Sequence, residues 1–106
     1  MSIIAPTASP QNISLQSLNA TALLVSWNPV EEPFQNGKIR FYRVFINDMD
    51  NSHSFIQLDI SQATTTIVTD LKPFHTYSVE LAAYTIDFGP TSIAVNVTQP
   101  QSGIVY

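Results

Sequence analysis

Residues 71–77, with the sequence LKPFHTY, constrain the fold of this chain more than any other segment. They lead into an alternating apolar and polar run at 78–84, which is typical of a half-buried strand. A tyrosine at the start of such a strand can place its ring in the core and bond its hydroxyl to the backbone a few residues upstream, an arrangement called a tyrosine corner. We therefore predict that Tyr77 packs in the core beside Leu71 and donates a hydrogen bond to an upstream carbonyl, with Pro73 stiffening the turn.

The rest of the chain reads as short strands separated by turn signals. The longest gap, residues 28–38, contains Pro29, Pro33 and the dipeptide Asn36-Gly37, which favours a turn because both of its residues accept positive φ. No apolar period of helical spacing is present over a useful length. We predict seven strands, at about residues 12–18, 21–27, 39–47, 54–59, 64–69, 75–86 and 92–98, and hence an all-β, seven-stranded antiparallel sandwich.

Alternation within the predicted strands identifies the side chains of the core. On each strand the residues at every second position point to one face, so the apolar set is expected to be buried. The second strand ends this pattern with Trp27, which we expect to be the largest core residue. The predicted core sets are Leu23, Val25 and Trp27; Tyr42, Val44 and Ile46; Tyr77, Val79, Leu81 and Ala83; and Ile93, Val95 and Val97.

Composition narrows the class of partner. The 106 residues have a net charge of -4 and only 11% charged residues, less than half the usual share of about 25%, while 35 residues are Ser, Thr, Asn or Gln. A negative chain is not attracted to phosphate backbones or anionic lipid, and no apolar run reaches membrane-spanning length, so we expect neither nucleic acid nor direct membrane contact. The absence of cysteine excludes disulfides and thiolate chemistry.

The combined motifs resemble a fibronectin type III domain from about Pro10 to Thr98. The resemblance implies a seven-stranded, immunoglobulin-like sandwich whose sheets are A, B, E and C, C′, F, G, without the cysteine pair expected of immunoglobulin domains. The integrin-binding tripeptide Arg-Gly-Asp and the Trp-Ser-x-Trp-Ser signature of cytokine receptors, both known in this family, are missing. The motifs are Leu23-x-Val25-x-Trp27-Asn28-Pro29, Asn36-Gly37, Tyr42-x-Val44, Leu71-x-Pro73-x-x-x-Tyr77-x-Val79 with Ala83, and Gly89-Pro90-Thr91-Ser92.

The resemblance also implies a role and a domain division. We expect a non-catalytic extracellular module, for protein recognition and spacing, in a larger cell-surface receptor or adhesion protein, in contact with neighbouring domains and an unidentified protein partner. The alternative is an accessory domain of an enzyme, such as a receptor-type tyrosine phosphatase or a secreted carbohydrate-active enzyme. We expect residues 1–9 to be a linker or residues added for expression, 10–99 to be the domain and 100–106 to be an exit linker.

Three tripeptides match the acceptor pattern for N-glycosylation, at Asn12, Asn19 and Asn96. They are mild support for a secretory route, because a chain this rich in Asn, Ser and Thr contains one or two such tripeptides by chance. Asn96 is expected on the outward face of the last strand and Asn19 in a turn.

Other candidate sites have plain explanations. His53 and His75 lie in different segments without cysteine or paired carboxylates at ligand spacing, so we expect surface turn residues and neither a metal nor a cofactor site. Asp87-Phe88-Gly89 matches a kinase metal-binding tripeptide, but the other kinase motifs are missing. Leu58-Asp59-Ile60 resembles a short integrin-binding motif, and an ordinary strand end explains it equally well.

One cluster stands out from this background. The third strand carries Phe41, Arg43 and Phe45 opposite its core face, and the neighbouring sixth strand carries Tyr84 on the same side. Two interpretations remain open: a contact surface for another domain or protein, or a satellite core covered by the chain itself.

Overall fold

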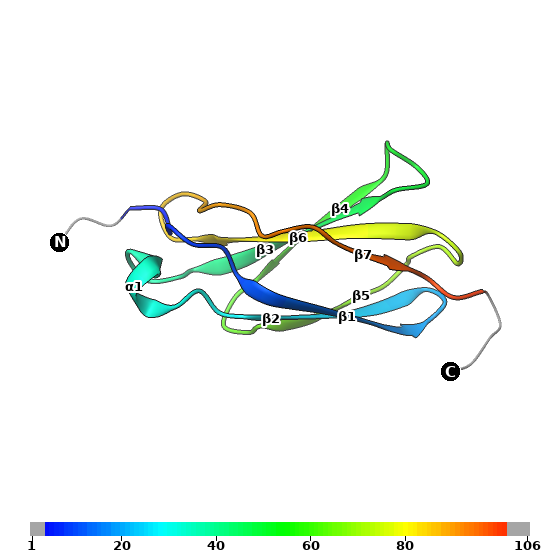
Figure 1. Cartoon of the computed structure of the whole chain (residues 1–106), viewed down its shortest axis with the longest axis horizontal. Helices are drawn as coiled ribbons and strands as arrows, with labels where there is room; N and C mark the ends of the chain where they lie inside the picture. The colour runs from blue at the N-terminus through cyan, green and yellow to red at the C-terminus, as the bar shows by residue number, and fades with distance from the viewer. Residues whose placement is uncertain (1–3, 102–106) are drawn as a thin grey trace.

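The computed structural model describes residues 4–101, which form two packed β-sheets (Figure 1). The seven strands and the family topology expected from the sequence are confirmed. No helix of the described chain is long and apolar enough to cross a membrane. The elements are β1 (Gln11–Asn19), β2 (Ala22–Asn28), α1 (Glu32–Gln35), β3 (Phe41–Asp48), β4 (Phe55–Ile60), β5 (Thr65–Val68), β6 (Thr76–Tyr84) and β7 (Val95–Thr98).

The sheets have three and four strands, ordered β1-β2-β5 and β4-β3-β6-β7, and every pairing is antiparallel. The longest register joins β3 to β6, from Phe41 opposite Tyr84 to Asp48 opposite Tyr77. Because side chains alternate across a strand, this register puts one set of residues in the core and the other on the outer face of the four-stranded sheet. The first described residues and the chain exit lie at opposite ends of the long axis (Figure 1).

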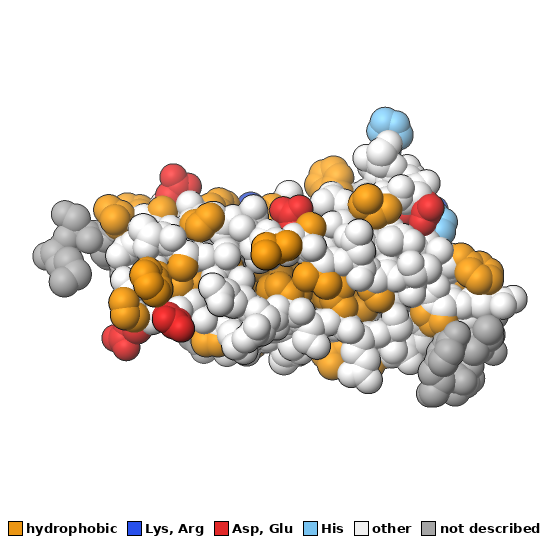
Figure 2. Space-filling view, viewed as in Figure 1, with side chains coloured by type: hydrophobic (Ala, Val, Ile, Leu, Met, Phe, Trp, Pro, Cys, Tyr) orange, Lys and Arg blue, Asp and Glu red, His pale blue; other side chains and the backbone are white. Residues whose placement is uncertain are grey.

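The core lies between the sheets and is built from the predicted alternating sets. The faces of β2, β3 and β6 that point inward are buried, as predicted from the sequence. Val30, Val68 and Leu71 complete the cluster from loops and β5. Val97 of β7 packs against the core and is partly buried. Along the seam between β1 and β7 the sandwich is more open, and apolar side chains are visible there (Figure 2).

The prediction for the start of the seventh strand was wrong, because a bulge reverses the side chains there. β7 begins at Val95, opposite Val79 of β6. The N–H of Ser92, three residues before Val95, binds the carbonyl of Leu81, which is only two residues beyond Val79, at 2.7 Å. One extra residue therefore lies on the β7 side, and such a shift turns the side chains to the opposite face. Ile93, predicted to be in the core, is 87% exposed, whereas Ser92 is buried with its Oγ accepting the N–H of Leu81.

The long gap between β2 and β3 contains a short helix that the sequence did not predict. Pro33 lies in the first turn of α1, where its missing N–H costs no helical hydrogen bond. Asn36, with φ of 58°, caps the end of the helix and is followed by Gly37 with φ of 142°, so the turn signal at Asn36-Gly37 is confirmed.

The described part of the expected N-terminal linker, residues 4–9, packs along the domain. Thr7 N–H binds the carbonyl of Phe34, and the hydroxyl of Thr85 donates to the carbonyl of Ile4 at 2.7 Å. At the other end Gln99 is buried, and residues 102–106 of the expected exit linker lie outside the described residues, as do residues 1–3. The boundaries at 10 and 99 stay predictions.

Candidate interaction surface

The tyrosine corner predicted from the sequence forms at the start of β6. Tyr77 is buried, and its hydroxyl oxygen accepts the N–H of Lys72 at 2.8 Å. The predicted direction of this bond was wrong, because the hydroxyl is the acceptor and the backbone is the donor. Leu71 is buried in the same core, and Pro73 lies in the turn between the two ends of the bond. Burial raises the pKa of Tyr77, which is partly offset by the N–H of Lys72, so the hydroxyl stays neutral at physiological pH.

Trp27 and Tyr42 form the other large packing unit of the core. Their rings meet edge to face at 5.7 Å between centroids. The Tyr42 hydroxyl accepts the N–H of Val30 at 3.1 Å, which anchors the loop after β2. Trp27 Nε1 is buried without a hydrogen-bond partner among the described residues. The role of both residues in this structure is packing.

Three of the four predicted surface residues come together on the outer face of the four-stranded sheet. The rings of Phe41 and Tyr84 stack at 4.6 Å between centroids, as expected for residues directly opposite in the register. Phe88, from the turn after β6, packs edge-on against both rings, at 5.9 and 4.9 Å. The Arg43 guanidinium carbon lies 4.7 Å from the Phe88 ring centroid. We call Phe41, Arg43, Phe45, Tyr84 and Phe88 the outer-face patch.

An ion pair fixes the cation of the patch. Arg43 binds Asp59 of β4 through two nitrogens, Nε to Oδ1 at 2.7 Å and Nη2 to Oδ2 at 2.9 Å. The hydrogen bonds from Arg43 lower the pKa of Asp59, and the bond to Asp59 raises that of Arg43. This two-point pairing holds the guanidinium plane over the aromatic rings, a geometry that a lysine could not reproduce. The carboxylate of Leu58-Asp59-Ile60 is therefore engaged within its own sheet.

Phe45 is separate from the stacked rings. It is half-buried and lines a shallow groove on the same face with Phe55, Gln57, Glu80 and Thr91. The patch is thus neither a fully covered satellite core nor a set of bare rings, since all five of its side chains are half-buried. Sequence reasoning did not place Phe88 or Asp59 at this patch, because Phe88 lies in a turn and the pairing of Asp59 with Arg43 depends on the β3–β4 register.

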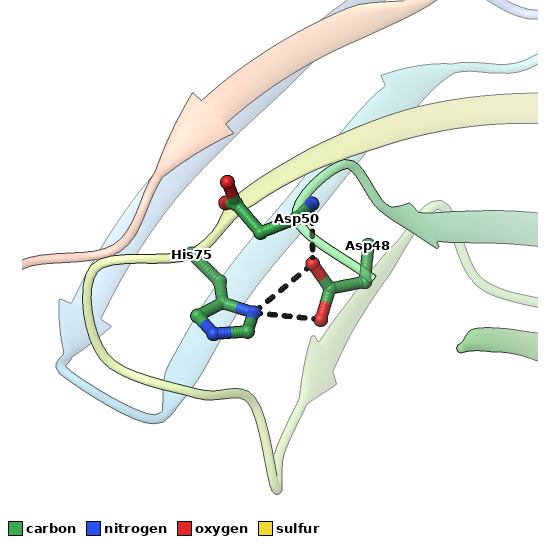
Figure 3. A group of neighbouring side chains, drawn as sticks. All are labelled: Asp48, Asp50 and His75. Carbon is green, nitrogen blue, oxygen red and sulfur yellow. Dashed lines mark hydrogen bonds and ion pairs between the residues drawn. The ribbon is translucent and has the colours of Figure 1, made fainter. Parts of the chain in front are cut away.

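A second cluster joins the end of β3 to the start of β6 (Figure 3). His75 Nδ1 lies 2.8 Å from Oδ2 of Asp48, whose side chain is 3% exposed, and Asp50 completes a group with ligand atoms within 4.8 Å of one another. His75, expected to be a plain surface turn residue, is therefore half-buried and hydrogen-bonded to Asp48, whereas His53 is exposed. The signal was available: pairing of β3 with β6 brings Asp48 opposite Tyr77 and so beside His75.

The hydrogen bonds of this cluster assign it a structural role. Oδ1 of Asp48 accepts the N–H of Asp50 at 2.9 Å, and Oδ2 of Asp50 accepts the N–H of Thr76 at 2.7 Å. Burial alone would raise the pKa of Asp48, but the bonds from His75 and from the Asp50 N–H outweigh it and lower that pKa. These bonds join the end of β3 and the turn after it to the start of β6, so the group acts as a lock between two strands.

The predicted glycosylation residues are all on the surface. Asn12, with φ of 53°, lies in an irregular part of β1; Asn19 ends β1, and Asn96 lies on the outer face of β7.

Comparison with known proteins identifies the fold family. The family model for the fibronectin type III domain matches residues 8–98. The chain belongs to the fibronectin type III family. This fibronectin type III domain is 32% identical over 100 residues to human receptor-type tyrosine-protein phosphatase F, covering 92% of the chain and 5% of that protein. It is 35% identical over 100 residues to human contactin-6, covering 92% of the chain and 10% of that protein.

A solved structure shows the same architecture. The FN5 domain of Drosophila Lar superposes with a TM-score of 0.77 at 28% identity, covering 92% of this chain and all of that one. A single fibronectin type III domain is non-catalytic. Because the domain spans a small fraction of its relatives, the activity and partners of a whole protein are matters for proposal.

Proposed function

We propose that this fibronectin type III domain is a non-catalytic recognition and spacing module in the extracellular part of a larger cell-surface receptor or adhesion protein. The observation that carries the proposal is the likeness to receptor-type tyrosine-protein phosphatase F and contactin-6. The matched region is only 5% of the first of these proteins and 10% of the second. The first and last described residues lie toward opposite ends of a body 53 Å long, an arrangement that suits a spacer between neighbouring domains.

The location is tested by staining cells that express the native protein with an antibody against this domain. Staining of intact cells is expected. Staining that requires permeabilised cells would overturn the extracellular location.

The second candidate is an accessory domain of an enzyme, which the likeness to a receptor-type phosphatase supports. Such a role is compatible with an extracellular domain, and the flanking sequence separates the two candidates. Further sandwich repeats without a catalytic domain favour the adhesion protein. A phosphatase domain beyond a membrane span, or a secreted catalytic domain, favours the enzyme.

Within this role, we propose the outer-face patch as the contact surface for a protein partner, which can be a neighbouring domain of the same chain. Aromatic rings and an arginine that is already held in place lose little side-chain entropy on contact, and residues of these types dominate interface energetics. The low charge of the chain offers little repulsion, so for the isolated domain the available partner is a second copy.

Sedimentation of the isolated domain at high concentration tests this surface. Wild type is expected to self-associate weakly, and Phe45→Ser to remain folded and lose the association. Ile67→Ser is the matched control, because Ile67 is 55% exposed on the outer face of the other sheet. Unfolding of Phe45→Ser would assign Phe45 to a satellite core instead. Equal association of all three chains would also refute the patch.

A further inference from the structure

We propose that Asn19 and Asn96 are N-glycosylation sites whose glycans both lie at the exit end of the domain, with the glycan on Asn96 projecting from the same outer face as Phe45 of the outer-face patch. Each residue begins an Asn-x-Thr tripeptide, Asn19-Ala20-Thr21 or Asn96-Val97-Thr98. The inference rests on the proposed extracellular location, since this modification belongs to secreted and surface proteins. It adds to that proposal by stating which side of the domain is covered.

The turn between β1 and β2 presents Asn19 as a ready acceptor. Asn19 is exposed, and its Oδ1 accepts hydrogen bonds from both the N–H of Thr21 at 2.9 Å and the Thr21 hydroxyl at 3.1 Å. These bonds use only the amide oxygen. Nδ2 has no hydrogen-bond partner within residues 4–101, so a glycan on this nitrogen leaves the turn intact.

Asn96 is accessible for a different reason. It is exposed on the outer face of β7, opposite Ser78 of β6, while Val95 and Val97 point inward. β7 is an edge strand, so a bulky group beside it disturbs no neighbouring strand on its free side. Such a group would also obstruct pairing of the free edge with another chain, a protection that edge strands commonly need.

Both sites lie near the point where the chain leaves the domain. The side chain of Gln99 donates to the carbonyl of Asn19 at 3.1 Å, and Asn96 is three residues before Gln99. The patch shares the outer face with Asn96: Ser78, the partner of Asn96, is six residues along β6 from Tyr84 but only two from Glu80, the partner of Phe45. At the rise of a strand these offsets are about 20 Å and about 7 Å. A glycan on Asn96 therefore lies close to Phe45 and farther from the stacked rings of Phe41 and Tyr84.

The third tripeptide is not included in the proposal. Asn12 lies in an irregular part of β1 and lines the groove formed with Ile93 and Val95, so a glycan there would be pressed against apolar surface.

The modification is a group transfer with a defined donor. Nδ2 of the asparagine bonds to the anomeric carbon of an oligosaccharide carried on a lipid diphosphate. The bond between that carbon and the diphosphate oxygen breaks, its electron pair leaves with the lipid diphosphate, and the proton lost by the nitrogen passes to solvent. The side chains need supply only an accessible amide and the Thr hydroxyl two residues on.

The test uses the 106-residue chain secreted from a eukaryotic cell by a cleavable signal peptide. All chains carry Ser14→Ala, which removes the tripeptide at Asn12. Intact mass is measured before and after treatment with an amidase that removes N-glycans, and peptide mapping locates the occupied sites. Two glycans are expected. Thr21→Val should lose only the glycan on Asn19, and Thr98→Val only the one on Asn96, whereas the matched Thr→Ser variants keep both.

The outcomes separate this inference from the proposed function. A folded, secreted chain with Asn19 or Asn96 unoccupied overturns the inference and leaves the extracellular role standing, because the signal peptide was supplied. Native protein that is stained only in permeabilised cells overturns the extracellular role, even if the secreted chain is glycosylated at both sites. Deglycosylation is expected to strengthen the self-association through the outer-face patch, because the glycan on Asn96 lies beside Phe45. Equal sedimentation of glycosylated and deglycosylated chains would overturn this placement of the glycan.

Discussion

Replacing Tyr77 by Phe removes one oxygen and leaves the ring in place. The oxygen accepts the N–H of Lys72 at 2.8 Å, so the variant leaves a backbone donor without its partner. An unsatisfied buried donor costs about 1 to 3 kcal/mol. Lys72 itself is exposed, and water can reach the neighbourhood of its backbone, so we expect the lower half of that range, about 1 to 2 kcal/mol.

Urea unfolding measures this difference with a built-in probe. Trp27 is the single tryptophan and is buried, so its fluorescence reports the folded state. With a slope of about 1 to 3 kcal/mol per molar urea, the midpoint should fall by an amount on the order of 1 M while the slope stays constant.

Tyr84→Phe is the matched control, because within the described chain the Tyr84 hydroxyl has no hydrogen-bond partner. It should change stability by less than about 0.5 kcal/mol. Equal midpoints for Tyr77→Phe and Tyr84→Phe would refute the view that the corner hydrogen bond stabilises the fold.

Four further changes test other parts of the structure. Trp27→Ala should destabilise the domain by about 3 to 5 kcal/mol through a cavity in the core, as measured by circular dichroism during urea unfolding. Ile93→Ser should alter stability by less than about 0.5 kcal/mol, and a loss of about 2 kcal/mol would contradict the bulge. The pKa of Asp48 is lower in the folded than in the unfolded domain, so this carboxylate stabilises the fold above its unfolded pKa of about 4. That stabilisation is lost as pH falls through the folded pKa, so Asp48→Asn should flatten the acid side of the plot of unfolding free energy against pH. Gly89→Ala should destabilise the domain by about 1 to 3 kcal/mol or detach the N-terminal segment, residues 4–9, because a Cβ would lie 2.7 Å from the carbonyl oxygen of Pro6. An unchanged proteolysis rate and an unchanged urea midpoint would contradict that packing.

The sequence by itself determined the sandwich, because strand alternation and turn chemistry are local. The alternating sets on β2, β3 and β6 needed only the period of two, and Asn36-Gly37 needed only the tolerance of these residues for positive φ. Phe41, Arg43 and Tyr84 could be placed together for the same reason, once β3 and β6 were taken as neighbours.

The tertiary structure decided what depends on register and on contacts far apart in the chain. A bulge before β7 turned Ile93 out and Ser92 in, although the local pattern read as continuous. The pairing of Arg43 with Asp59 depends on the β3–β4 register. The lock between His75 and Asp48 joins residues that are 27 positions apart in the sequence. Alternation specifies which residues share a face, but a one-residue shift in pairing changes every partner, and only the packed sheets fix that shift.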